Sequence, residues 1–148
     1  MQEEKGSGLR TSTLFRRLFK TADIKDFIEN NQVDLKIPVF HDYIEQMRNE
    51  RGEKKSDIAS RASIEKAFCN QLFNGTRKPS RDKVIQLAFG FGLDLEGTQK
   101  MLQIAQKSPL YPRLKRDAAI IYCINHLFNI DKTQSLLHDL GLQILGET

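Results

Sequence analysis

The segment from Gly52 to Ser80 places two short helical patterns on either side of a turn, and this arrangement constrains the fold more than any other feature of the chain. Ile58 and Ala59 give the first pattern an apolar edge, and Ser63 stands where the turn falls. The second pattern, over 65–73, has an apolar face at helical spacing, made of Phe68, Cys69, Leu72 and Phe73. Two short helices joined in this way form a helix-turn-helix unit.

A basic loop follows the second helical pattern. Asn74 and Gly75 tolerate the left-handed conformation in which helices commonly end. Arg77 and Lys78 then place two cations side by side, and Ser80 is suited to cap the next helix.

This segment resembles the phage repressor/Cro (XRE-type) helix-turn-helix family. The likeness rests on Ile58-Ala59, on Ile64, on Leu72 and above all on the run 74–80, which reads Asn-Gly-Thr-Arg-Lys-Pro-Ser. It spans roughly residues 39–105. The resemblance implies an all-α fold, a lambda-repressor-like helix-turn-helix bundle of five helices with additional N- and C-terminal helices.

The resemblance also implies a function: a bacterial, sequence-specific regulator of transcription that binds double-stranded DNA and reads a major groove with helix 65–73. It assigns contacts with base edges to Lys55, Lys66, Ala67, Asn70 and Gln71. It assigns contacts with phosphates to Asn74, Thr76, Arg77 and Lys78. Lysine reaches guanine acceptors, asparagine and glutamine pair with adenine, and an alanine methyl meets a thymine methyl.

Three residues depart from the family pattern and favour a second interpretation. Glu53 stands where the family usually has an apolar residue, Glu65 places a carboxylate where phosphate would repel it, and Phe68 replaces a small polar residue. The alternative is therefore a protein-interaction adaptor that keeps the fold without operator binding and meets a protein partner through the C-terminal helices. The resemblance implies a twofold homodimer, although no heptad pattern marks a dimer seam.

Charge and composition agree with a nucleic-acid partner only mildly. The net charge is +4, of which +3 falls between residues 41 and 83, on the helix-turn-helix segment. The two cysteines, Cys69 and Cys123, lie on apolar helical faces, which is typical of buried thiols in a reducing cytoplasm. We expect no membrane partner, no cofactor and no metal site, because no apolar run approaches the ~20 residues of a membrane span and no His/Cys cluster has ligand spacing. Without a nucleophile motif or phosphate loop, we expect no enzyme activity.

The sequence predicts four segments. These are a disordered tail over 1–12, an N-terminal helical extension over 13–37, the repressor-like domain over 38–107 and a C-terminal helical hairpin packed on it over 108–148. We expect the last three to form one body. In the extension, six apolar residues should face inward: Leu14, Phe15, Leu18, Phe19, Ile24 and Ile28, together with Phe27. A basic amphipathic helix on a membrane surface is the alternative for 13–20.

An internal repeat dominates the C-terminal half. Residues 81–110 align with 116–145 without a gap at an offset of 35, with seven identical pairs. Each copy predicts a helix, a short loop and a second helix, with Asp94 and Asn129 as the equivalent caps. We expect Gly90 and Gly92 to break the first helix of copy one, and Leu102, Leu137 and Leu140 to face inward.

Overall fold

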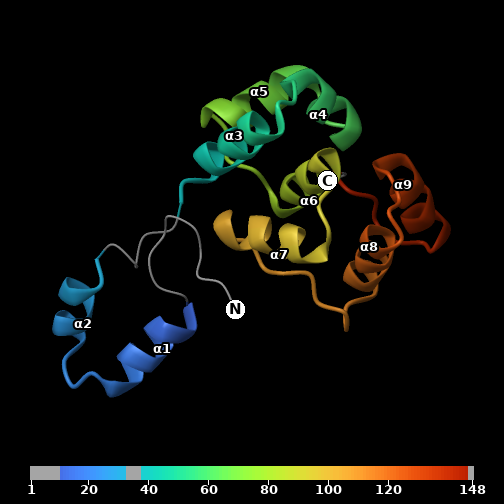
Figure 1. Cartoon of the computed structure of the whole chain (residues 1–148). Coiled ribbons are helices and arrows are strands. Elements are labelled where there is room, and N and C mark those ends of the chain that lie inside the picture. Colours follow the sequence, from blue (N-terminus) through green and yellow to red (C-terminus); the bar gives the residue numbers. More distant parts are fainter. Residues whose placement is uncertain (1–10, 33–37, 147–148) are drawn as a thin grey trace. The chain divides into compact units, whose positions relative to one another are not determined.

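The computed structural model describes residues 11–32 and 38–146 of the 148-residue chain. This part contains nine helices and no strand, which confirms the all-α class (Figure 1). The chain divides into two compact units, Met1–Ile37 and Pro38–Thr148. The tail predicted over 1–12 lies outside the described residues as far as residue 10, and Thr11 already begins the first helix.

The N-terminal unit is a hairpin of α1 (Thr11–Lys20) and α2 (Ile24–Asn30). The Asp23 carboxylate caps α2 by accepting from the Lys25 N–H. The buried Asn31 amide donates to the Phe27 carbonyl and accepts from Arg17 at the end of the hairpin. The expectation of an inward apolar face is wrong for most of its residues. Phe27 is buried, whereas Phe15, Leu18, Phe19, Ile24 and Ile28 are exposed.

The second unit carries the other seven described helices. They are α3 (Phe40–Arg51), α4 (Lys55–Ala62), α5 (Lys66–Asn74), α6 (Arg81–Phe91), α7 (Leu95–Ile104), α8 (Lys115–Asn125) and α9 (Ile130–Asp139). Five of them fall between residues 40 and 104, as the sequence predicts. The caps expected from sequence are also present, because the side chains of Ser80, Asp94 and Asn129 each accept from a first-turn N–H of α6, α7 and α9.

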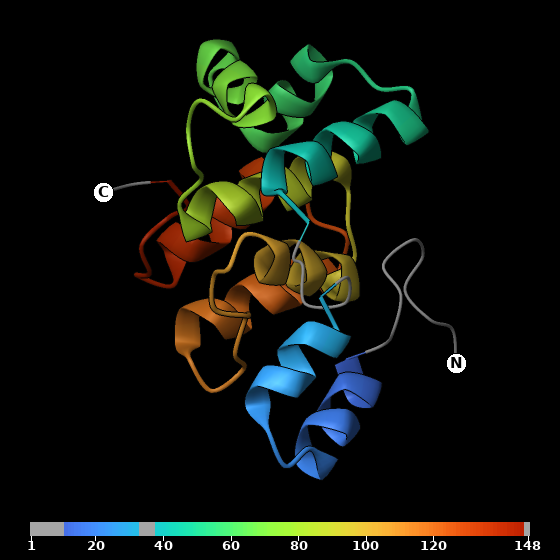
Figure 2. The ribbon, with the colours of Figure 1, turned by 90° about the vertical axis from the view of Figure 1, so that its left-hand side faces the viewer.

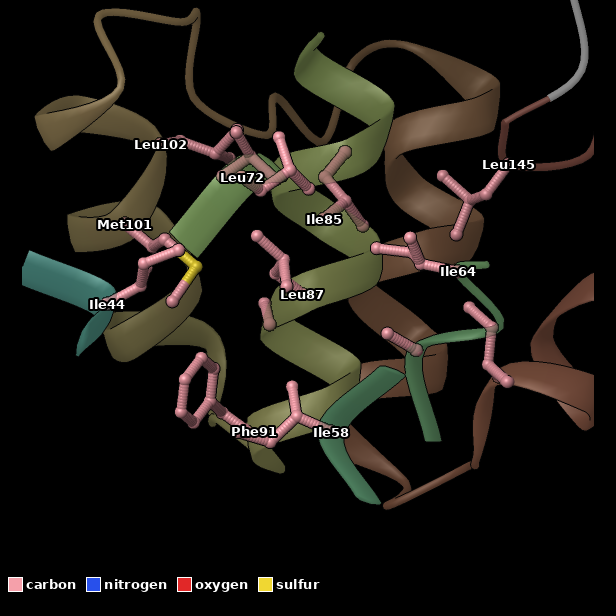
Figure 3. Packing of buried hydrophobic residues seen from close by; sticks show 14 of the residues in the cluster. Ile44, Ile58, Ile64, Leu72, Ile85, Leu87, Phe91, Met101, Leu102 and Leu145 are labelled. Atoms are coloured by element: carbon pink, nitrogen blue, oxygen red, sulfur yellow. The ribbon is translucent and has the colours of Figure 1, made fainter. Parts of the chain in front are cut away.

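Helix α6 lies at the centre of this unit, between α3–α5 on one side and α7–α9 on the other (Figures 1 and 2). Residues on both of its faces are buried, because it has covering helices on both sides. Side chains of α3, α4, α5 and α7, together with Leu145 near the C-terminus, meet those of α6 (Figure 3). The core includes Ile44, Ile58, Leu72, Ile85, Leu87, Met101 and Leu102.

Hydrogen bonds from polar side chains join α6 to α3 and α4. The buried Gln86 amide donates to the carbonyls of Ala62 and Ser63, which lie at the end of α4 and lack intrahelical partners. In the other direction, Arg61 donates to the Gly90 carbonyl and Arg51 to the Phe91 carbonyl, at the end of α6. A side chain of α6 therefore satisfies carbonyls at the C-terminus of α4, and side chains of α3 and α4 satisfy carbonyls at the C-terminus of α6.

Gly90 does not break α6, contrary to the sequence-based expectation. The helix continues through Gly90 and ends at Gly92, which adopts a left-handed conformation with φ +66°. A Cβ at Gly90 would lie 2.8 Å from the Ile58 carbonyl oxygen and 2.9 Å from the Ala62 Cβ. Glycine at this position therefore permits the close approach of α4 to α6.

The internal repeat is visible in the packing. Leu102 and Leu137, its equivalent, are both 0% exposed, as predicted, whereas Leu140 is 57% exposed and does not face inward. Helix α6 contacts α9, and α7 contacts α8, so the two hairpins exchange equivalent contacts.

Hydrogen bonds cross between the two copies in matched pairs. Arg81 binds the Asp117 carboxylate, and Arg116 binds the Asp82 carboxylate, each through two bonds of 2.8–3.1 Å. The same arginines also donate to carbonyls offset by 35 residues: Ser108 and Pro109 for Arg81, Gln143 and Ile144 for Arg116. This exchange is the contact pattern of a twofold dimer, here built within one chain.

Each copy also closes its own hairpin with a glutamine. The Gln99 amide donates to the Leu110 carbonyl and accepts from its N–H, and Gln134 does the same with Leu145. The seven identities include both glutamines, both arginines and both aspartates, so the repeat conserves the side chains that fold and join the hairpins.

Candidate nucleic-acid interface

The turn between α4 and α5 forms as the sequence predicts. Ser63 adopts the left-handed conformation with φ +57°, and the Ile64 N–H bonds back to the Ala59 carbonyl. Ile64 is buried beside the inward faces of both helices. Because these faces are held by the core, the opposite face of α5 is presented to solvent.

The exposed face of α5 carries three of the residues assigned to base edges. Lys66, Ala67 and Asn70 are all exposed, and Asn70 lies one helical turn after Lys66 and Ala67. Within the described residues, neither the Lys66 ammonium nor the Asn70 amide has a hydrogen-bond or ion-pair partner. The face thus offers a cation, a methyl group and a free amide.

Gln71 differs from these three residues, because the structure joins it to Arg77. Gln71 is half-buried, and its side-chain oxygen accepts from the Arg77 Nε at 3.1 Å. The backbone N–H of Arg77 bonds to the Gln71 carbonyl at 3.3 Å. The side-chain oxygen of Gln71 therefore orients the Arg77 guanidinium, while the Gln71 NH₂ group remains available.

Phe68 lies under two cations. The Arg77 guanidinium is 4.4 Å from the centre of the Phe68 ring, and the Lys83 ammonium is 5.2 Å from it. Cations at this distance are attracted to the face of an aromatic ring. The phenylalanine that departs from the family pattern therefore supports charged side chains instead of protruding as an apolar obstacle.

Asn74 organises the loop after α5. Its side-chain oxygen accepts from the Thr76 N–H at 2.9 Å and from the Thr76 hydroxyl at 2.7 Å. Gly75 between them has φ +84°, and its Cα faces the His41 ring so closely that a Cβ would lie 2.7 Å away. The Asn74 amide nitrogen stays open, while its oxygen is committed to the turn.

Lys55 lies apart from the α5 face. It is half-buried, and its ammonium is 5.8 Å from the centre of the Phe73 ring. The same ammonium lowers the pKa of the Cys69 thiol, but burial is the larger influence and raises the pKa above its usual value. Cys69 is therefore a neutral core residue.

The two acidic departures have different surroundings. The Glu53 carboxylate, half-buried, forms an ion pair with Arg61. Its charge is therefore compensated within the protein. Glu65 is exposed at the N-cap of α5 without a partner among the described residues, although a carboxylate there is favoured by the positive end of the helix dipole.

An open hollow of about 580 Å³ adjoins these residues at the start of α6. It is lined by Phe68, Arg77, Lys78, Ser80, Arg81, Asp82, Lys83 and Gly146. Arg81 and Asp82 are neutralised by ion pairs with Asp117 and Arg116. Arg77, Lys78 and Lys83 have no carboxylate partner in the described part of the chain, so the hollow is cationic.

Lys83 was not found from the sequence. It is three residues past Ser80 and its backbone N–H bonds to the Ser80 hydroxyl, so it reads as an ordinary first-turn residue of α6. Only the fold places its ammonium over the Phe68 ring, 5.2 Å from its centre.

Other kinds of site find little support in the described residues. Among them, no group of three or more His, Cys, Asp and Glu side chains is placed to hold a metal ion. No helix there is both long and apolar enough to cross a bilayer. The chain matches no protein-family model, no curated protein and no solved structure.

Proposed function

We propose that this protein binds double-stranded DNA through its helix-turn-helix unit, with α5 in a major groove, and regulates transcription. In this proposal, α3–α7 form a lambda-repressor-like bundle, with the helices on either side as additions. The observation that carries it is the link between α5 and the hollow. Gln71 of α5 accepts from Arg77, and Arg77 lines the hollow with two further cations, Lys78 and Lys83, none of which has a carboxylate partner among the described residues.

Lys66, Ala67 and Asn70 are the residues placed for base edges, since they are exposed on one face of the helix. Gln71 joins them through its free NH₂ group, while its oxygen holds Arg77. Lys55 is directed toward the Phe73 ring and is the weakest of the assigned base contacts.

Arg77, Lys78 and the newly found Lys83 are the cations for phosphates, with Thr76 and the Asn74 amide beside them. Such contacts fix register and carry no sequence information by themselves. Phe68 supports the proposal because its ring holds Arg77 and Lys83 together before any ligand arrives, and pre-organisation lowers the entropic cost of binding.

The test is fluorescence anisotropy with labelled duplexes, selected and scrambled, over a salt series. Asn70→Ala should cost about 1–3 kcal/mol on the selected duplex and little on the scrambled one. Arg77→Ala should weaken both duplexes and reduce the salt slope by about one. Lys132→Gln, an exposed cation on α9, is the matched control and should leave both affinities unchanged.

Two further variants separate direct contact from positioning. Gln71→Ala should lower affinity for both duplexes, since Arg77 loses its side-chain partner, and should add a loss confined to the selected duplex. Glu65→Gln should strengthen binding to the scrambled duplex because a carboxylate near phosphate is removed.

The adaptor alternative is favoured by one observation, the uncompensated Glu65 carboxylate at the start of α5. It makes the opposite prediction for the wild-type protein. If no duplex binds at low salt, where the electrostatic attraction is greatest, the DNA proposal fails and the adaptor takes its place.

A further inference from the structure

The hollow at the start of α6 has the size of a small-molecule site. Its volume is about 580 Å³, within the range of roughly 300–1,000 Å³ that is typical of ligand pockets. Its lining comes from Phe68 on α5, from residues between 77 and 83, and from Gly146 after the second hairpin. All of these residues belong to the unit formed by residues 38–148, so that unit contains the whole lining.

The side chains that line the hollow carry an excess of three positive charges. Arg81 and Asp82 are each paired with a residue of α8, so their own charges are compensated. Arg77, Lys78 and Lys83 have no carboxylate partner among the described residues. A phosphate monoester carries a charge of about −1.5 to −2 at neutral pH, so one phosphate group does not balance three cations. Two linked phosphate groups come closer to balance.

Lys83 is held in place by a buried side chain. Its ammonium donates to the Gln86 side-chain oxygen at 3.1 Å. Gln86 is 2% exposed, and its NH₂ group donates to the carbonyls of Ala62 and Ser63, so its oxygen is the end that meets Lys83. Because an ammonium has several donors, Lys83 keeps N–H groups for a ligand. This cation is therefore positioned before an anion arrives.

Arg77 is oriented in a comparable way. Its Nε donates to the Gln71 side-chain oxygen at 3.1 Å, and its two terminal nitrogens have no hydrogen-bond partner in the described part of the chain. Arginine can offer such N–H groups to phosphate oxygens as parallel hydrogen bonds. Arg77 and Lys83 both lie over the Phe68 ring, at 4.4 and 5.2 Å from its centre, so at most one aromatic ring separates their charges. A compact anion can therefore meet both.

Gly146 lines the hollow from a part of the sequence far from α6. Its N–H bonds to the Asp82 carboxylate at 3.0 Å. A Cβ at Gly146 would lie 3.1 Å from the Lys83 ammonium nitrogen and 2.8 Å from the Gln86 side-chain oxygen. The backbone also has φ +82° there, which favours glycine. Glycine therefore leaves the Lys83 ammonium where its hydrogen bond places it.

We infer that the hollow binds a soluble oligophosphate, which is a small molecule with at least two phosphate groups linked through oxygen. Consecutive phosphates of a nucleic-acid strand are separated by a sugar, whereas linked phosphate groups share one oxygen and suit cations gathered around one ring. The regulatory consequence rests on the proposed function. Because the same cations would contact the duplex, the oligophosphate should displace DNA.

Binding is tested first without nucleic acid. Isothermal titration calorimetry of the full chain with inorganic tripolyphosphate should show a single site. Inorganic phosphate should bind roughly tenfold more weakly, because one group cannot engage all three cations. Citrate carries several charges on carboxylates spread over a carbon chain, and it should also bind more weakly than tripolyphosphate.

Substitutions then locate the site. Lys83→Gln should lower the affinity for tripolyphosphate roughly tenfold, because a charge-assisted hydrogen bond is lost. Arg77→Gln, at an exposed position, should give a comparable loss. Lys132→Gln is the matched control and should leave the affinity unchanged. Its ammonium also lies over a phenylalanine ring, 4.1 Å from the centre of Phe128, but it does not line the hollow. Circular dichroism checks that all three variants keep the fold.

Three results would each overturn the inference. The first is a wild-type protein that does not bind tripolyphosphate. The second is equal affinity for citrate, which would mean that the hollow recognises charge alone. The third is an affinity for tripolyphosphate that neither Lys83→Gln nor Arg77→Gln lowers.

The duplex measurement separates this inference from the DNA proposal. Tripolyphosphate should weaken duplex binding more than sodium chloride does at the same ionic strength, and an equal effect would refute the competition. A protein that binds the duplex but not tripolyphosphate would contradict the inference alone. A protein that binds tripolyphosphate but no duplex would contradict the DNA proposal alone.

Discussion

Gly90 decides how closely two helices approach. It lies inside α6, where glycine lowers helix stability by roughly 1 kcal/mol relative to alanine. The absence of a Cβ lets the backbone of α4 reach it, with the Ile58 carbonyl 2.8 Å from the position that a Cβ would occupy. Gly90 thus lowers the intrinsic stability of α6 but permits a contact with Ile58, more than 30 positions earlier in the chain.

Gly90→Ala should therefore destabilise the protein, although alanine is the better helix former. We expect a net loss of about 1–3 kcal/mol in the free energy of unfolding, because Cβ would overlap backbone that has no room to shift. Urea denaturation measures the loss. Gly97→Ala in α7 is the control, since its nearest contacts would be at 3.2 Å, and it should change stability by less than about 1 kcal/mol. A Gly90→Ala protein as stable as the wild type would show that the α4–α6 contact relaxes without cost.

At the scale of elements, the two hairpins show how a repeat becomes one core. Each hairpin closes on itself through a glutamine, Gln99 or Gln134. Each then binds the other through an arginine and an aspartate that exchange partners. Local hydrogen bonds therefore shape the hairpins, and the crossed ion pairs set their mutual orientation.

The two equivalent leucines should behave alike. Leu102→Ala and Leu137→Ala should each cost about 2–5 kcal/mol, because both side chains are 0% exposed and their removal leaves cavities. Leu140→Ala should cost less than about 1 kcal/mol, since that side chain is 57% exposed. Chemical denaturation of the three variants is the measurement. A small loss for Leu137→Ala beside a large one for Leu102→Ala would mean that the second hairpin unfolds separately from the first.

At the scale of the unit formed by residues 38–148, the C-terminal segment returns to the start of α6. The Gly146 N–H and the Arg116 guanidinium both bind the Asp82 carboxylate. Burial alone would raise the pKa of Asp82, but these hydrogen bonds and the charges of Arg116 and Arg81 hold it below its usual value. Asp82 therefore joins the central helix to the last described residues.

This lowered pKa gives stability a defined pH dependence. Because the folded-state pKa of Asp82 is below the unfolded-state value of about 3.9, its contribution is complete at neutral pH. It is lost as the pH falls from the unfolded-state value through the folded-state value. Asp82→Asn should cost about 1–3 kcal/mol near neutrality and progressively less in acid, measured by urea denaturation across pH. A difference between the two proteins that stays constant down to the lowest pH would mean that the carboxylate charge contributes nothing.

The features that local rules govern were predictable from the sequence. Helical spacing predicted α3 to α9, and the Ser63 turn and the caps at Ser80, Asp94 and Asn129 formed as expected. Each of these depends on residues within a few positions of one another. The exposed side of α5 followed in the same way, so Lys66, Ala67 and Asn70 lie together.

The parts that failed depend on distant partners. Gly90 was expected to break a helix because its contact with α4 is invisible in α6 alone. Inward faces were expected for the N-terminal hairpin and for Leu140 from helical spacing alone, but Phe15, Ile28 and Leu140 are exposed.

The sequence by itself determined the helices, their caps, the turn and the 35-residue repeat, because backbone conformation and apolar spacing are set by near neighbours. The tertiary structure alone decided which charges are neutralised. It paired Glu53 with Arg61 and crossed Arg81 and Arg116 onto the opposite hairpins. It also gathered Arg77, Lys78 and Lys83 around one hollow, where none has a carboxylate partner within the described part of the chain. It also left Leu114 and Tyr122 of the α8 region exposed while burying both sides of α6. The physical reason is that charge compensation and burial depend on distances between side chains far apart in the chain, and folding sets those distances.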